Sequence, residues 1–144
     1  MRLQIRAVIL GAALAVSGMP AQADFSVRDY CEVTLKASEI DELAWKDRLS
    51  LEQSHQGPSK ALDVKLQSLD AQYGRFRNQV YAHYGTTFQD YLRYGAGHQA
   101  AITLYLEQNV DLKRALSDAS SQIRSLRQQM ESVMSARHAA EARR

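Results

Sequence analysis

The chain has 144 residues, a formal net charge of +2 and one cysteine. This length suits one small domain, and so small a basic excess argues against a nucleic-acid partner, because a protein that grips phosphates normally carries a clear basic surplus. A single cysteine excludes an intramolecular disulfide. The chain also lacks the His-Glu-x-x-His and paired-cysteine spacings of common zinc and haem sites.

The N-terminal segment has the plan of a secretory signal peptide, with two arginines, an apolar stretch over 7–16 and a small-x-small cleavage site at 21–23. The apolar stretch is shorter than the roughly 20 residues that a bilayer-spanning helix needs. We therefore expect a cleavable signal at 1–23 and a single α-helical domain at 24–144 with a frayed C-terminal tail. An alanine-rich signal is typical of Gram-negative bacteria, so we expect an exported, soluble periplasmic protein without a transmembrane segment after cleavage.

Apolar residues that recur every three or four positions predict a first helix over about 26–53 and a second over about 60–84. The Gly-Pro dipeptide at 57–58 separates them, because both residues end helices, and Ser59 can cap the second one. The second apolar stripe runs over 62–84 at the spacing of a coiled-coil seam.

A stop at Gly85 separates the second helix from a third that begins near residue 88. Thr86 and Thr87 each precede by three residues a side chain that completes a capping box, so two registers are open. The third helix is expected to bend at the glycines of 95–97, because glycine is a poor helix former.

A last helix can be capped by Asn109 or Asp111, and its apolar residues from 112 to 133 repeat the four and three spacing without a miss. Strand-like alternation is absent. The predicted fold class is therefore all-α, with three to four helices in an antiparallel helical bundle or an elongated helical hairpin with coiled-coil-like seams.

Tyrosine and histidine are concentrated in the middle of the chain, where they can line a pocket for haem or a similar ring. The alternative interpretation is that amphipathic rings fill the wide part of a bundle. The candidate ligand-binding residues are Tyr81, His83, Tyr84, Tyr91, Tyr94 and His98.

Met130, Met134 and His138 follow one another at four-residue spacing on one side of the last helix. Thioether and imidazole groups are the donors that Cu(I) prefers, so a copper site is one hypothesis. The alternative is ordinary packing, because Met130 lies on the apolar seam.

Cys31 has two interpretations as well, an intermolecular disulfide in an oxidising compartment or a small buried apolar residue.

The chain has no Gly-x-Ser-x-Gly elbow and no glycine-rich phosphate loop, so we predict that it is not an enzyme and has no resident cofactor.

Long amphipathic helices with charged flanks bind other helices. The leading hypothesis is a cell-envelope protein that mediates protein–protein interaction as an adaptor, chaperone-like factor or inhibitor. Its expected partner is another envelope protein or a second copy of itself in a homodimer. The alternative is a periplasmic carrier of haem or a copper ion. The candidate interaction residues on the last helix are Lys113, Arg114, Arg124 and Arg127.

Overall fold

The computed structural model describes residues 24–55 and 59–143, so the predicted signal peptide and the Gly-Pro break lie outside the described residues. Within the described ranges the protein has five helices and no strand. They are α1 (Val27–Ser54), α2 (Ser59–His83), α3 (Phe88–Gly97), α4 (Gln99–Gln108) and α5 (Val110–Glu141). The all-α prediction is confirmed, whereas the count of three to four helices is too low. The last helix extends to Glu141.

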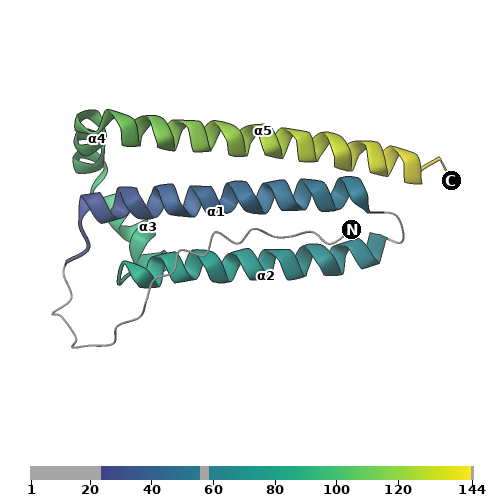
Figure 1. The fold of residues 1–144 in the computed structure, drawn as a ribbon, viewed down its shortest axis with the longest axis horizontal. Coiled ribbons are helices and arrows are strands. Elements are labelled where there is room, and N and C mark those ends of the chain that lie inside the picture. Colours follow the sequence, from purple (N-terminus) through teal and green to yellow (C-terminus); the bar gives the residue numbers. More distant parts are fainter. Residues whose placement is uncertain (1–23, 56–58, 144) are drawn as a thin grey trace.

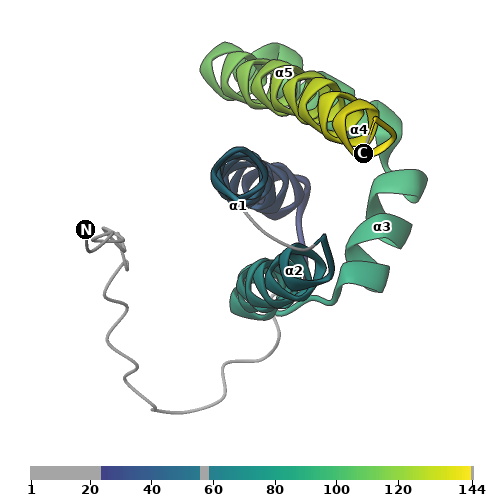
Figure 2. The ribbon, with the colours of Figure 1, turned by 90° about the vertical axis from the view of Figure 1, so that its right-hand side faces the viewer.

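Helix α1 lies between α2 and α5, and α3 and α4 gather at one end of the three long helices (Figure 1). Figure 2 shows α1 flanked by the two other long helices, whose backbones have no close contact with each other in the described ranges. The helix pair α1 and α2 is antiparallel, but α5 runs parallel to α1. Connections that reverse the chain make only consecutive long helices antiparallel, so the first and third must run the same way. The expected antiparallel arrangement therefore fails for α1 and α5.

Helix α1 begins with a capping box at Ser26. The Ser26 hydroxyl accepts a hydrogen bond from the Asp29 backbone N–H at 3.1 Å, and the Asp29 carboxylate accepts one from the Ser26 backbone N–H at 2.9 Å. Hydrogen bonds from the Ser26 hydroxyl and backbone N–H lower the pKa of Asp29, because they stabilise its ionised form.

The turn between α2 and α3 confirms the predicted stop at Gly85, which has φ +66°. The Gly85 and Thr86 backbone N–H groups donate to the carbonyls of Ala82 and Tyr81, both at 3.0 Å, as in a Schellman motif. Of the two capping registers, the protein uses the one at Thr87, whose hydroxyl accepts from the third residue of α3 at 3.2 Å.

Single residues separate α3 from α4 and α4 from α5. At each break the side chain bonds the carbonyl four residues earlier: His98 Nδ1 lies 2.9 Å from Tyr94 O, and Asn109 Nδ2 lies 2.7 Å from Tyr105 O. Because a carbonyl oxygen only accepts, Nδ1 of His98 must carry the proton. Each residue occupies the N-cap position of the helix that follows, as predicted for Asn109, but neither side chain makes a capping hydrogen bond. The predicted bend at 95–97 is thus displaced to His98.

The apolar core is small and lies on both sides of α1. Towards α5, Leu49 packs with Leu126 and Met130, and Trp45 and Val133 border this cluster. The seam predicted for α2 faces inward too. Its most buried members are Leu62 and Tyr73, with Tyr81 beside them. Among the described helices, none combines the length and apolarity needed to cross a membrane.

Candidate interaction site

Stacked tyrosine rings hold α3 against the first half of α1. The Tyr30 ring stacks on Tyr91 at a centroid distance of 4.6 Å and on Tyr94 at 5.8 Å. The Tyr91 hydroxyl lies 2.8 Å from the Thr34 hydroxyl, which satisfies both polar groups. The backbone of Gly95 passes so close to Tyr30 that a Cβ added there would lie 2.5 Å from its hydroxyl oxygen.

Four of the six candidate ligand residues belong to this cluster. The Tyr81 ring meets Tyr91 at 5.4 Å, and Tyr94 stacks on His98 at 3.9 Å. Burial raises the pKa of Tyr81, Tyr91 and Tyr94. The rings occupy one another's faces, so a planar ligand would have to replace one of these contacts. This geometry gives the carrier hypothesis no support.

The other two candidate ligand residues lie apart from the stack. His83 meets the Tyr84 ring edge-on at 5.2 Å and is exposed. The Tyr84 hydroxyl donates to Glu32 on α1 at 3.0 Å. Tyr84 therefore ties α2 to α1 instead of facing the stacked rings.

The three candidate copper ligands do not share one environment. Met130 is 3% exposed and packs in the core between α1 and α5, whereas Met134 and His138 are exposed. Within the described ranges, no group of three or more His, Cys, Asp or Glu side chains is placed to hold a metal ion. The burial of Met130 favours its interpretation as packing.

Cys31 is 1% exposed, and burial raises the pKa of its thiol. A disulfide with a second chain requires an approach that this burial blocks. The small, buried apolar residue is thus the interpretation that the structure favours.

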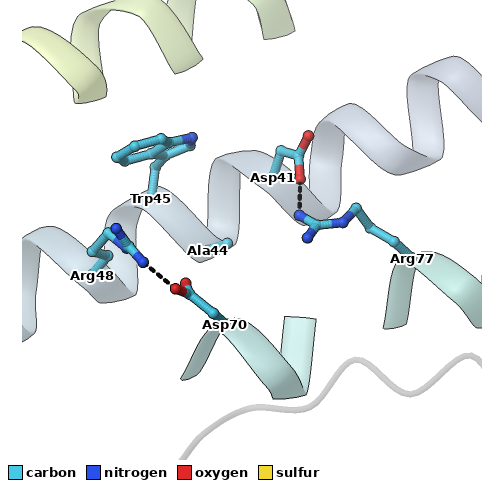
Figure 3. Close-up of a pocket in the computed structure, with 6 residues that line it drawn as sticks. All are labelled: Asp41, Ala44, Trp45, Arg48, Asp70 and Arg77. Atoms are coloured by element: carbon cyan, nitrogen blue, oxygen red, sulfur yellow. Dashed lines mark hydrogen bonds and ion pairs between the residues drawn. The ribbon is translucent and has the colours of Figure 1, made fainter. Parts of the chain in front are cut away.

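Polar side chains join α1 to α2 around a hollow of about 170 Å³ (Figure 3). Asp41 pairs with Arg77 at one end of the hollow, and Arg48 pairs with Asp70 at the other. Ala44 lies between the two pairs, as the close-up shows. Each cation here already has its own carboxylate, so the hollow has no surplus charge with which to select a ligand.

A second set of polar contacts lies at the end of the molecule away from α3 and α4. Glu52 is 7% exposed and accepts a hydrogen bond from Arg137 at 2.7 Å, and Glu141 accepts one from Ser59 at 2.8 Å. These bonds link the end of α5 to α1 and α2. A buried carboxylate needs such a partner, because an unpaired buried charge is costly.

The four candidate interaction residues of α5 are all exposed, but they are not equivalent. The Arg127 guanidinium lies 5.2 Å from the centre of the Trp45 ring, a cation–π contact that fastens α5 to α1. Arg114 lies 3.7 Å from Asp111. Lys113 and Arg124 form no ion pair with any described residue.

Exposed apolar side chains are concentrated at the end of the molecule formed by α3 and α4. Of the eight large hydrophobic residues exposed in the described ranges, four fall between 88 and 110, namely Phe88, Leu92, Leu104 and Val110. The stretch 94–106 contains no Asp, Glu, Lys or Arg, and most of it is exposed. This end therefore offers the longest uncharged surface segment of the described chain.

The junction of α4 and α5 carries an open hollow of about 420 Å³. Residues of both charges surround its apolar member, Val110. The lining residues are Glu107, Val110, Lys113, Arg114, Ser117 and Asp118. Two of the candidate interaction residues thus border the exposed apolar end.

Two residues of these contacts, Tyr30 and Trp45, were not among the predicted site residues. Tyr30 lies on the apolar stripe of the first helix and Trp45 lies beside it, but nothing in that stripe says which distant helix each ring meets. Comparison with protein-family profiles, with curated protein sequences and with solved structures gave no match.

Proposed function

We propose that the protein is a non-enzymatic, exported envelope protein that binds another protein through the end formed by α3 and α4. The observation that carries the proposal is the uncharged stretch 94–106, which includes the half-exposed Leu104, directly after the half-exposed Phe88 and Leu92 of α3. Exposed apolar patches of this kind mark interaction surfaces, because water otherwise contacts them at a cost.

A protein partner is favoured over a lipid surface by charge. Peripheral contact with anionic lipid requires a basic excess, worth about 1 kcal/mol for each Lys or Arg near the surface. The segment 88–114 has three acidic and three basic residues, so it offers no such attraction. A neutral, partly apolar patch with a charged border is instead typical of a protein–protein interface.

The coiled-coil-like seams, which first suggested partner binding, are occupied within the molecule. Leu62 of α2, and Leu126 and Met130 of α5, are buried in contacts of the chain with itself. The partner therefore meets the end of the bundle, and not the seams.

A photo-reactive amino acid at position 104, expressed in the envelope of the host, tests the proposal. We expect a discrete cross-linked product with one other protein, identified by mass spectrometry. The same amino acid at position 43 is the matched control, because Leu43 is 53% exposed and Leu104 is 56% exposed, but Leu43 lies on α1. Equal products at both positions, or products only with lipid, would contradict the proposal.

A second pair of variants separates binding from folding. Leu92→Ser should reduce the cross-linked product several-fold, because it removes apolar surface from the patch, whereas Val64→Ser on α2 should not. Both side chains are at least half exposed, so the helical circular dichroism of both variants should match that of the original protein.

A further inference from the structure

The outer side of α5 near its start is unpartnered and carries charges of both signs. Leu112 and Leu116 are half-buried and Ala119 is buried, so this side of α5 faces inward and the exposed stripe through Val110 and Ser117 faces outward. This stripe forms most of the lining of the open hollow at the junction of α4 and α5.

The charged side chains that border this stripe form few ion pairs within the described residues. Lys113, Glu107 and Asp118 form no ion pair with any described residue, and Arg114 has only the long 3.7 Å contact with Asp111. Two cations and two anions around one hollow leave it close to neutral. Such a surface can meet an identical surface without like-charge repulsion.

The order of these charges along α5 is self-complementary. Arg114 and Asp118 are four residues apart, so they lie on the same edge of the outward stripe. When two identical helices pack antiparallel about a two-fold axis, equivalent edges face each other. A two-fold axis midway between the two residues therefore places Arg114 of each copy opposite Asp118 of the other. The dimer thus contains two such ion pairs.

No like charges meet in the same register. Lys113 falls at the level of Ala119 of the other copy, and Asp111 falls at the level of Ser121. The exposed side chain of Val110, 57% accessible in the single chain, comes to lie against the second helix. The contact thus covers apolar surface as well as pairing charge.

We infer that a second copy of this chain occupies the outer face of α5, in an antiparallel contact in which Arg114 of each copy pairs with Asp118 of the other. The inference rests on the proposed interaction function. It names a second copy of the chain as the partner of the outer face of α5, next to α4. It leaves the end formed by α3 and α4 open for the other protein.

Sedimentation equilibrium of the protein, expressed from its full sequence and purified, tests this contact. The original protein should be a dimer, and both Arg114→Glu and Asp118→Arg should weaken dimerisation by at least about tenfold, because each sets like charges opposite each other twice. Mixing the two variants in equal amounts should restore the dimer, since both pairs then become complementary. A pair within one chain cannot be restored by mixing.

Lys65→Glu on α2 is the control, because Lys65 is exposed and lies away from α5. It should leave the dimer unchanged, and circular dichroism should show that all variants keep their helices. A monomeric original protein, or a dimer insensitive to either charge reversal, overturns the inference. Cross-linking from position 104 to another protein would still stand in that case, so the two proposals fail separately.

Discussion

The ring of Tyr30 is held in place from two sides. It stacks on the rings of Tyr91 and Tyr94, and its edge rests on the backbone of Gly95. A side chain at position 95 would therefore meet a ring that cannot turn aside without losing its stacking contacts. Gly95 is needed for close approach, although a glycine within a helix costs about 1 kcal/mol relative to alanine.

We predict that Gly95→Ala lowers the free energy of unfolding by about 1–2 kcal/mol, because overpacking outweighs the gain in helix propensity. Urea denaturation followed by circular dichroism measures the change. Gly74→Ala is the matched control, because a Cβ there has no atom within 4 Å, and it should stabilise by about 0.5–1 kcal/mol. Equal effects of the two substitutions would show that Tyr30 does not press on Gly95.

The breaks on either side of α4 depend on single side chains. At Asn109 the backbone N–H bonds Leu106 O at 3.3 Å, and the side-chain amide takes over the bond to Tyr105 O. The bend directs α5 back along α1, so this one amide helps to set the course of the longest helix.

Asn109→Ala should lower the free energy of unfolding by about 1 kcal/mol, the usual net value of one hydrogen bond. Asn78→Ala provides the comparison, because Asn78 is exposed in the interior of α2, where alanine is the better helix former. Urea titrations of both variants should therefore move in opposite directions. A stabilised Asn109→Ala variant would mean that the amide bond does not support the bend.

The bounds of α1 and α2 could be predicted from the sequence to within one residue. Apolar spacing located α2, and Gly85 marked its end, because both signals are local. The break at His98 was displaced from the predicted glycines, since a side-chain bond to Tyr94 O, and not glycine flexibility, decides where the helix ends. Local patterns thus place helices better than they place the breaks between them.

The sequence does not predict which helices pack against each other. Four of the six candidate ligand residues lie in one cluster, but Tyr30, which joins this cluster to α1, lies far away along the chain. Likewise, the seam of α5 shows an apolar side without showing whether α1 or α2 covers it. The identity of the covering helix depends on the whole arrangement, in which α1 is the common neighbour.

At the scale of the whole molecule, α1 is the element that holds the others together. The α2 side relies on hydrogen bonds such as that from the Tyr73 hydroxyl to Asp47 at 2.6 Å, and the α3 side relies on stacked tyrosines. Phenolic groups therefore lie at both contacts. Burial is the largest cause of the raised pKa of Tyr73, and the Asp47 carboxylate adds to it by favouring the protonated phenol.

This dependence on protonated tyrosine predicts alkaline unfolding. Five of the seven tyrosines have a pKa raised above the ordinary value of about 10, chiefly by burial. They are Tyr73, Tyr81, Tyr84, Tyr91 and Tyr94. Their contribution to stability is fully present below the unfolded-state pKa. It is lost as pH rises from there towards the folded-state values, because only the unfolded chain releases these protons readily.

Absorbance of tyrosinate and helical circular dichroism, recorded together from neutral to strongly alkaline pH, measure this coupling. Most of the tyrosinate signal should appear late and together with the loss of helicity. In Tyr73→Phe the pH dependence of the free energy of unfolding should be less steep, because one fewer proton is released on unfolding. Ionisation of all the tyrosines near pH 10 with the helices intact would mean that the phenols are not the groups that hold α2 and α3 to α1.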